Sequence, residues 1–352
     1  MPLLHLERIG KRFAGVTALR GVDFTLEPGE VHALVGENGA GKSTLIKVMT
    51  GAHRRDGGRM LLNGEDVDFR SPAEAQAAGI TAVHQEIQLL GLRTVAENIF
   101  LAREPRRLGL VHWRRMFDEA RAALDRVGLD VDPRAIAGTL STAQQQMVAI
   151  ARGISLGARV LVLDEPTSSL AEREVAALHD LVRRLRDEGT GVVYVSHRFD
   201  ELYALCDRVT ILRDGALVGT HPIATLDRID LVCMMLGRTR DEVRREATAP
   251  RARSASGDGP PLLEADAIAR VPRLHDVSLA VRKGEVVGLA GLLGSGRTET
   301  ARALFGVDPP QRGAVRSEGR DLALRGPADA IAARFAFCSE DRKAEGIIPE
   351  LS

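Results

Sequence analysis

Residues 29–45, GEVHALVGENGAGKSTL, decide the fold of this chain. The apolar run Val31 to Val35 is typical of a buried strand. It leads directly into GENGAGKS, Gly36 to Ser43, which matches the spacing G-x-x-x-x-G-K-[ST]. A strand, a glycine-rich turn, Lys, Ser and then a helix predict a phosphate-binding loop on an α/β fold.

The loop's composition matches this role. Glycines let the backbone curl so that N–H groups point inward, and the helix that we expect from Thr44 onward presents its positive N-terminus. Lys42 would bring a charge to the β and γ phosphates, and Ser43 would offer a hydroxyl to Mg²⁺. We therefore assign ATP contacts to Gly36, Glu37, Asn38, Gly39, Ala40, Gly41, Lys42, Ser43 and Thr44.

Composition excludes several classes of protein. At 352 residues the chain has room for two or three domains. Lys plus Arg equal Asp plus Glu at 48 each, so we expect no nucleic-acid partner. The three cysteines lie far apart, which is typical of a reducing compartment and predicts no metal other than Mg²⁺. No apolar run approaches the roughly 18 residues that span a bilayer, so any membrane role must come through a partner.

Alternating apolar residues in 4–6 and 22–26 predict an antiparallel strand pair before the loop. Phe13 lies between these runs, and its ring either packs in the core or stacks on a nucleotide base. Asn63-Gly64 predicts a hairpin turn, and Ser71-Pro72 opens a short capped helix. From about residue 92 to 156 the pattern is helical.

Three further apolar strands end in polar side chains. Ile80 to Val83 leads to Gln85, which can reach a metal-bound water. Val160 to Leu163 ends in Asp164-Glu165, and we predict Asp164 on the metal and Glu165 facing the water. Val192 to Val195 ends in Ser196-His197. The carboxyl ends of parallel strands meet in one crevice, so His197, although a lone His is more often structural, becomes a catalytic candidate with Glu165 and Gln85.

A capping box opens the helix between two of these strands. Ser141 is followed three residues later by Gln144, within LSTAQ, Leu140 to Gln144. A capped helix start is also an anion site. Spacing alone leaves plain capping and anion binding equally open.

The second half of the chain repeats the first. Gly29, Gly36, Gly41, Gly51 and Pro72 recur as Gly284, Gly291, Gly296, Gly306 and Pro327, at a constant offset of 255 residues. Repetition in register over this length indicates two copies of one domain. We predict a first domain at 1–246, a linker rich in Pro, Gly, Ser and Arg at 247–261, and the N-terminal part of a second copy at 262–352.

The second copy differs where chemistry would occur. Arg297 replaces Lys42 and presents a planar fork instead of a compact ammonium. Glu340 replaces Gln85, and Thr298 keeps the hydroxyl. This second loop, Gly291, Gly294, Gly296, Arg297 and Thr298, is expected to hold nucleotide but to be poor at hydrolysis.

Residue 352 corresponds to residue 97 of the first copy, so residues 262–352 hold no counterpart of 140–144, 164–165 or 197. We expect this sequence to be a fragment of a longer chain. We also expect its second half to be poorly ordered by itself, because a parallel sheet without its central strand exposes apolar faces.

Together these residues resemble the ATP-binding cassette (ABC) family. Gly36 to Thr44 matches its phosphate loop, Gln85 its Q-loop, LSTAQ its signature, Val160 to Glu165 its second Walker motif, Ser169-Leu170 its D-loop and His197 its switch histidine. The stretches TVAENIFLARE, QQQMVAIAR, DEPTSSL, RDGALVGT, GLLGSGRTE and SEDRKAEGI are similar to the tandem ATPases of bacterial ribose, xylose and galactose importers.

The resemblance implies a nucleotide-binding cassette with a mostly parallel central sheet, an antiparallel β subdomain, a helical subdomain and a partial second cassette. It implies an ATP hydrolase with Mg²⁺, peripheral at the cytoplasmic face of the membrane. Its partners would be integral-membrane permease subunits and, indirectly, an extracytoplasmic sugar-binding protein. Ser43, Gln85 and Asp164 would surround the metal.

The signature departs from the LSGGQ of the wider family. Thr142 and Ala143 add side chains where backbone would approach a γ-phosphate. Family geometry pairs the loop of one copy with the signature of the other, so LSTAQ would face the Arg297 site. Both departures from the family pattern, LSTAQ and Arg297, would then lie at one nucleotide site formed by the two copies together.

Two rival functions share parts of this pattern. A soluble tandem cassette acting on ribosomes would be expected to keep Lys in both loops and to carry a long charged helical linker, and neither occurs here. An importer of the same architecture for nucleosides or another small solute stays open, because the permease and the binding protein choose the solute.

Overall fold

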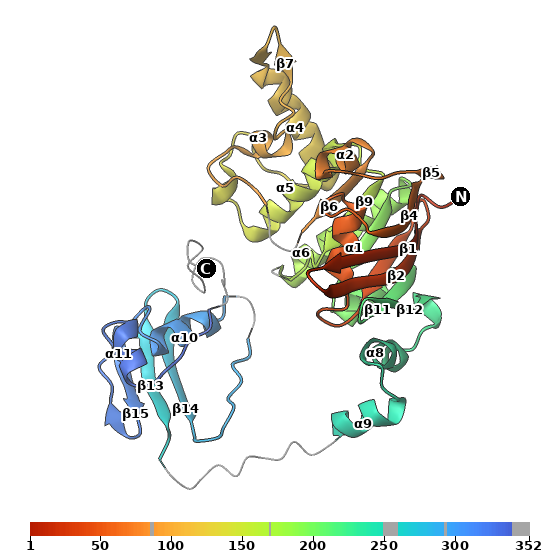
Figure 1. The fold of residues 1–352 in the computed structure, drawn as a ribbon. Helices are drawn as coiled ribbons and strands as arrows, with labels where there is room; N and C mark the ends of the chain where they lie inside the picture. The colour runs from red at the N-terminus through yellow and green to blue at the C-terminus, as the bar shows by residue number, and fades with distance from the viewer. Residues whose placement is uncertain (85–87, 169, 249–259, 292–293, 340–352) are drawn as a thin grey trace. The chain divides into compact units, whose positions relative to one another are not determined.

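The computed structural model describes residues 1–84, 88–168, 170–248, 260–291 and 294–339. The chain divides into two compact units, Met1–Thr248 and Ala249–Ser352 (Figure 1). Within the described ranges, no helix combines the length and the apolar character needed to cross a membrane.

A six-stranded sheet forms the centre of the first unit. Its strands are β3 (Val31–Val35), β6 (Ile80–Val83), β9 (Val160–Asp164), β10 (Gly191–Val195), β11 (Arg208–Arg213) and β12 (Ala216–Pro222). They run in the order β12-β11-β3-β10-β9-β6, all parallel except β12. Strands β3 and β10 are buried along their whole length, as expected of parallel strands covered on both faces. The predicted α/β class and mostly parallel sheet are confirmed.

An antiparallel sheet covers one face of the central sheet. It consists of β1 (Leu4–Phe13), β2 (Val16–Leu26), β4 (Gly57–Leu62) and β5 (Glu65–Asp66), in the order β2-β1-β4-β5. Leu4 pairs with Leu26, which confirms the predicted strand pair. Asn63 and Gly64 both have positive φ and form the predicted β4–β5 turn. The apolar sides of β1 and β2 pack with helix α1 (Lys42–Met49) and the central sheet in one core.

Helices cover the other face of the central sheet and build a separate lobe. They are α3 (Val95–Ile99), α4 (Trp113–Val127), α5 (Thr142–Ser155), α6 (Glu172–Asp187), α7 (Phe199–Leu205) and α8 (Arg228–Leu236), with 3-10 turns at Ala137–Thr139 and Ile223–Thr225. Helix α2 (Pro72–Ala77) packs instead in the core of the antiparallel sheet, and α9 (Arg240–Thr248) follows α8. In Figure 1, α3, α4 and α5 stand together at one end of the central sheet, below a small hairpin of β7 (Arg106–Arg107) and β8 (Leu110–Val111). This is the helical part that the pattern from residue 92 to 156 predicts.

Two local predictions need correction. The helix after the phosphate loop begins at Lys42 and not at Thr44, because Gly41, with φ +103°, ends the loop as the N-cap. The core alternative for Phe13 is wrong, since the residue is 38% exposed. The centroid of its ring lies 5.1 Å from that of the His53 ring and 5.3 Å from Lys11 Nζ.

The second unit repeats the antiparallel sheet and the first helix. Strands β13 (Leu263–Arg270), β14 (Leu274–Val281), β15 (Arg312–Ser317) and β16 (Arg320–Asp321) lie in the order β14-β13-β15-β16, with helices α10 (Arg297–Leu304) and α11 (Pro327–Ala332). Helix α10 begins and ends 255 residues after α1. The internal repeat predicted from sequence is therefore a structural repeat.

The first hairpin of the second copy is shorter. Leu4 and Leu26, which pair in the first unit, are 22 residues apart, whereas the equivalent pair Leu263 and Val281 are 18 apart. The four missing residues come from the tip, the part of the hairpin that carries Phe13. The constant offset of 255 residues therefore holds from the second strand of the hairpin onward, and it becomes 259 in the first strand.

The stretch equivalent to β3 also differs. Residues 286–291 form no strand, and Val286 is 97% exposed, whereas Val31 is fully buried. In the first unit β3 is held between β10 and β11. Strands β10 and β11 follow residue 97 of the first copy, the position equivalent to residue 352, so residues 262–352 include no counterpart of those two neighbours.

Candidate functional site

The phosphate loop and the end of β9 surround one cavity of about 250 Å³ in the first unit. Its lining residues are Ala18, Asn38, Gly39, Gly41, Lys42, Ser43, Thr44, Asp164 and Glu165. Parallel strands β3 and β9 are separated by one strand, so their carboxyl ends open on the same edge of the sheet. The structure thus brings the predicted loop and the predicted carboxylates together.

Two glycines of the loop are required by close backbone contacts. A Cβ added at Gly36, where φ is +155°, would lie 2.3 Å from the Leu212 carbonyl oxygen. At Gly41, where φ is +103°, it would lie 2.9 Å from the Ala18 carbonyl oxygen. Both positions need a residue without a side chain. Ala40, by contrast, is buried in the core and anchors the loop.

Lys42 is held by the loop's own carbonyl groups. Its Nζ donates to Gly36 O at 2.7 Å and to Glu37 O at 3.0 Å. Burial lowers the pKa of Lys42, while the nearby charges of Glu165 and Asp164 oppose that change. The ammonium group is therefore a cation fixed at the mouth of the loop, where a phosphate would accept its hydrogen bonds.

Asp164 and Glu165 crowd two carboxylates into the same cavity. Burial raises the pKa of Asp164, and the charge of Glu165 raises it further. Repulsion of this kind is relieved by a cation. Carboxylate and hydroxyl oxygens are the ligands that Mg²⁺ prefers, and Ser43 lines the same cavity. The donor set therefore fits the predicted Mg²⁺ site.

Glu165 contacts the predicted switch histidine. Its Oε1 lies 2.9 Å from His197 Nδ1, although the two residues are 32 positions apart. The backbone of Glu165 has φ +48°, an uncommon value for a residue with a side chain, and its N–H donates to Val195 O at 2.8 Å. The Glu165 side chain is 18% exposed and that of His197 71%. The ends of β9 and β10 thus place a sheltered carboxylate beside an exposed imidazole.

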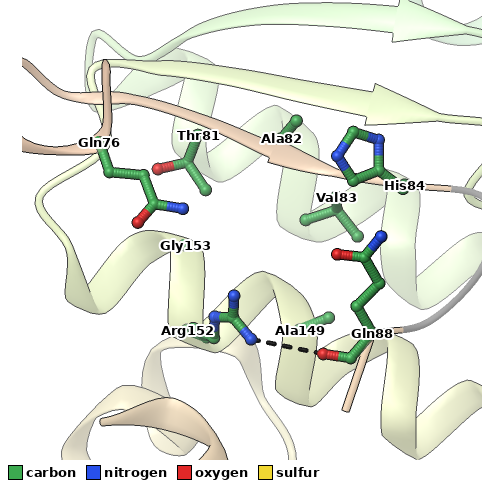
Figure 2. A pocket seen from close by; sticks show the side chains of 9 residues that line it. All are labelled: Gln76, Thr81, Ala82, Val83, His84, Gln88, Ala149, Arg152 and Gly153. Atoms are coloured by element: carbon green, nitrogen blue, oxygen red, sulfur yellow. Dashed lines mark hydrogen bonds between the residues drawn. The ribbon is translucent and has the colours of Figure 1, made fainter. Parts of the chain in front are cut away.

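The predicted Q-loop residue Gln85 lies outside the described residues, as does its counterpart Glu340. The residues flanking Gln85 line a small cavity of about 30 Å³ between β6 and α5. Figure 2 shows Arg152 and Gln88 facing each other there, with Arg152 Nη1 donating to the Gln88 carbonyl oxygen at 3.4 Å. Burial lowers the pKa of Arg152. The chain on the C-terminal side of Gln85 is thus tied to the signature helix.

The signature residues lie away from the Lys42 cavity. Ser141 Oγ accepts from Gln144 N at 3.2 Å, and Gln144 Oε1 accepts from Ser141 N at 3.0 Å, which confirms the capping box. Thr142 is exposed, Ala143 is buried and Leu140 packs on the core. None of these residues lines the cavity around Lys42.

The second loop keeps part of the first loop's geometry. Gly294 and Gly296 have positive φ, and Gly296 is the N-cap of α10, as Gly41 is of α1. Arg297 opens the helix where Lys42 does, with Thr298 next to it. Gly291 has no such φ. Thr298 lines a cavity of about 430 Å³ that also includes Arg270 and Arg273.

Sequence reasoning missed two features of the first site. Ala18, at the start of the β1–β2 return, lines the cavity, and its carbonyl oxygen packs against Gly41. A buried carboxylate, Glu201, lies behind the catalytic candidates and accepts from Thr167. DEPTSSL contains Thr167, but neither its composition nor its spacing indicated a partner 34 residues away.

Known proteins match the chain along most of its length. The sequence pattern of the family described as ABC transporter matches residues 19–168 and 274–351. The ribose import ATP-binding protein RbsA 1 of Rubrobacter xylanophilus is 52% identical over 351 residues, which is 100% of this chain and 69% of that protein. The ribose import ATP-binding protein RbsA of Geobacillus kaustophilus is 44% identical over 352 residues, 99% of this chain and 70% of that protein.

Solved structures match as well. A nucleotide-free ATP-binding cassette from an ABC transporter superposes with a TM-score of 0.57 at 28% identity, covering 63% of this chain and 92% of that one. The ADP conformation of another cassette gives a TM-score of 0.57 at 26% identity, covering 69% and 98%. With its phosphate loop, paired carboxylates and strand order, the chain belongs to the ABC transporter family.

Proposed function

We propose that this chain is the ATP-hydrolysing subunit of an importer for a simple sugar, and that ATP occupies the cavity around Lys42. The observation that carries the proposal is that one cavity is lined by a phosphate loop with a fixed ammonium group and by two carboxylates. Two relatives are named for ribose import, which supports a sugar as the transported solute.

The phosphates would replace the loop carbonyls as partners of Lys42. Backbone N–H groups of the loop and the N-terminus of α1 would complete their binding. The exposed ring of Phe13, at the tip of the β1–β2 hairpin, would stack on the base. The same loop and helix start would also contact ATP through Glu37, Asn38, Ala40 and Thr44.

Hydrolysis would depend on the position of a few groups. Glu165 would orient and polarise the attacking water, and His197, which contacts Glu165, would reach the γ-phosphate. Lys42 would stabilise the charge that builds on the transferred phosphoryl group. Most of the rate enhancement would then come from positioning and electrostatics.

Asp164 and Ser43 would hold Mg²⁺, with Gln85 reaching it through water. When bound, Mg²⁺ supplies positive charge to the phosphate oxygens. The raised pKa of Asp164, caused by burial and by Glu165, supports a cation at this place.

The chain would act at the cytoplasmic face of the membrane, docked on permease subunits that receive the sugar from an extracytoplasmic binding protein. Closure of two cassettes over ATP would drive the permease. The Arg297 site would hold nucleotide with little hydrolysis, because Arg297 takes the place of Lys42 in the second loop.

The experiment is uptake by proteoliposomes that contain the permease co-purified with this chain, with the partner binding protein added outside. Trapped ATP should drive accumulation of a radiolabelled pentose or hexose, and a chain with Lys42→Ala should give none. Accumulation of a labelled nucleoside, with no sugar uptake, would favour the second candidate, a nucleoside importer of the same architecture. ATP-independent uptake would reject both.

A further inference from the structure

A buried polar cluster contacts the two loops that carry the catalytic candidates Glu165 and His197. Its centre is the carboxylate of Glu201 on α7, which is 4% exposed. Three hydroxyl groups donate to the same oxygen, Oε2: Thr167 at 2.8 Å, Tyr194 at 3.0 Å and Ser196 at 3.1 Å. The guanidinium of Arg198 forms an ion pair with Oε1 at 2.8 Å.

The cluster joins two loops that carry different parts of the site. Thr167 follows Glu165 by two residues, in the loop after β9. Ser196 precedes His197, in the loop after β10, and its Oγ also accepts from Arg198 N at 3.0 Å. Because both hydroxyls meet on one oxygen, movement of either loop is resisted by the other.

We propose that Glu201 is a positioning residue for ATP hydrolysis. By binding Thr167 and Ser196, it fixes the distance between Glu165 and His197. This inference rests on the proposed function. Glu201 does not line the cavity around Lys42, and its hydrogen bonds reach the two site loops through Thr167 and Ser196. Glu165, with its positive φ, has an uncommon backbone conformation that surrounding contacts must hold.

Buried carboxylates are costly unless hydrogen bonds satisfy them. A core position used only for packing would be better filled by an apolar residue, as its neighbours Leu202 and Leu205 are. Three hydroxyl donors from two site loops and one strand, together with the ion pair to Arg198, point to a role in holding the loops together.

Two matched variants test the proposal in the full chain. Thr167→Val and Tyr194→Phe each remove one hydroxyl from the same oxygen of Glu201, but only Thr167 lies in a site loop. Thr167→Val should lower kcat for ATP about tenfold with KM within about twofold, because the Lys42 loop is untouched. Tyr194→Phe should keep kcat within about twofold.

Conservative replacement gives a second comparison. Glu201→Ala should lower kcat about 100-fold, and Glu201→Gln, whose amide oxygen still accepts the hydroxyls, should recover most of that loss. The proposal would be overturned if Thr167→Val and Tyr194→Phe lost kcat equally. It would also be overturned if Glu201→Gln folded normally but had a kcat as low as that of Glu201→Ala.

Hydrogen exchange separates this inference from the proposed function. Without nucleotide, the backbone amides of residues 196–198 should exchange at least about threefold faster in Thr167→Val than in wild type, although Thr167 lies in the other loop. In Tyr194→Phe these amides should exchange at the wild-type rate. If the wild-type chain hydrolyses no ATP, the proposed function fails, and this comparison still decides whether Glu201 couples the loops. Unchanged exchange in both variants would contradict the coupling.

Discussion

Charged residues of the first site are stabilised by groups that are distant in sequence or by backbone. Glu165 pairs with His197, and Lys42 binds carbonyl groups of its own loop. At the opposite end of the sheet Glu30 likewise contacts the distant Arg208 at 2.6 Å, and it also contacts its near neighbour His32 at 3.0 Å. These contacts give predictions for single residues.

Lys42→Ala should weaken ATP binding about 100-fold, because the charged donor that would bind the phosphates is lost. Isothermal titration calorimetry measures the change in Kd. Lys47→Ala is the matched control, since Lys47 lies on the same helix, is exposed and does not line the cavity. A Kd for Lys42→Ala within threefold of the control would remove Lys42 from the site.

Glu30 should make folding sensitive to acid. Burial alone would raise its pKa, but hydrogen bonds from His32 and Arg208 outweigh burial and lower the pKa to about 2. Because this pKa is depressed, the ionised Glu30 carboxylate contributes fully to the free energy of unfolding above pH 4.5. That contribution is lost as the pH falls toward 2. It amounts to about 2 kcal/mol after allowance for solvent screening.

The measurement is the free energy of unfolding by urea between pH 6 and 2.5, for wild type and Glu30→Gln. The difference between the two proteins should shrink as the pH falls. A difference that stays constant with pH would show that Glu30 is not ionised in this contact.

Among the elements, those with a local cause were predictable. The strands β9 and β10 are short apolar runs followed by polar residues, and α5 begins with a capping box. What the sequence did not reveal depends on contacts between distant segments. The exposure of Phe13 and the place of Ala18 follow from how the β1–β2 hairpin returns beside the loop, and Glu201 meets Thr167 only after β9 and β10 pair.

The start of α5 offers a test at this scale. Ser141→Ala should lower the free energy of unfolding by about 1 kcal/mol, because Gln144 N loses its cap. Ser141→Asp should restore most of it, since a carboxylate caps equally well and suits the helix dipole. Urea titration at pH 7 measures both. Equal stability of Ser141→Ala and wild type would mean that the cap is not formed in solution.

In the molecule as a whole, one architecture occurs twice with unequal chemistry. The first copy has Lys42, Phe13 and both carboxylates, whereas the described part of the second has Arg297 and a shortened hairpin. The repeat itself and the replacement of Lys were visible in the sequence at the constant offset. The shortened hairpin and the unpaired residues 286–291 were not, because alternation of apolar residues does not fix strand length or partners.

The proposed function requires that the first copy hydrolyses ATP with Glu165 as the group that activates water. The most direct measurement is nucleotide binding and phosphate release by the full chain with Glu165→Gln, beside the control Glu188→Gln, an exposed carboxylate at the end of α6. Glu165→Gln should bind ATP within about threefold of wild type and release phosphate at least about 100-fold more slowly. Phosphate release by Glu165→Gln at the rate of the control would contradict the claim.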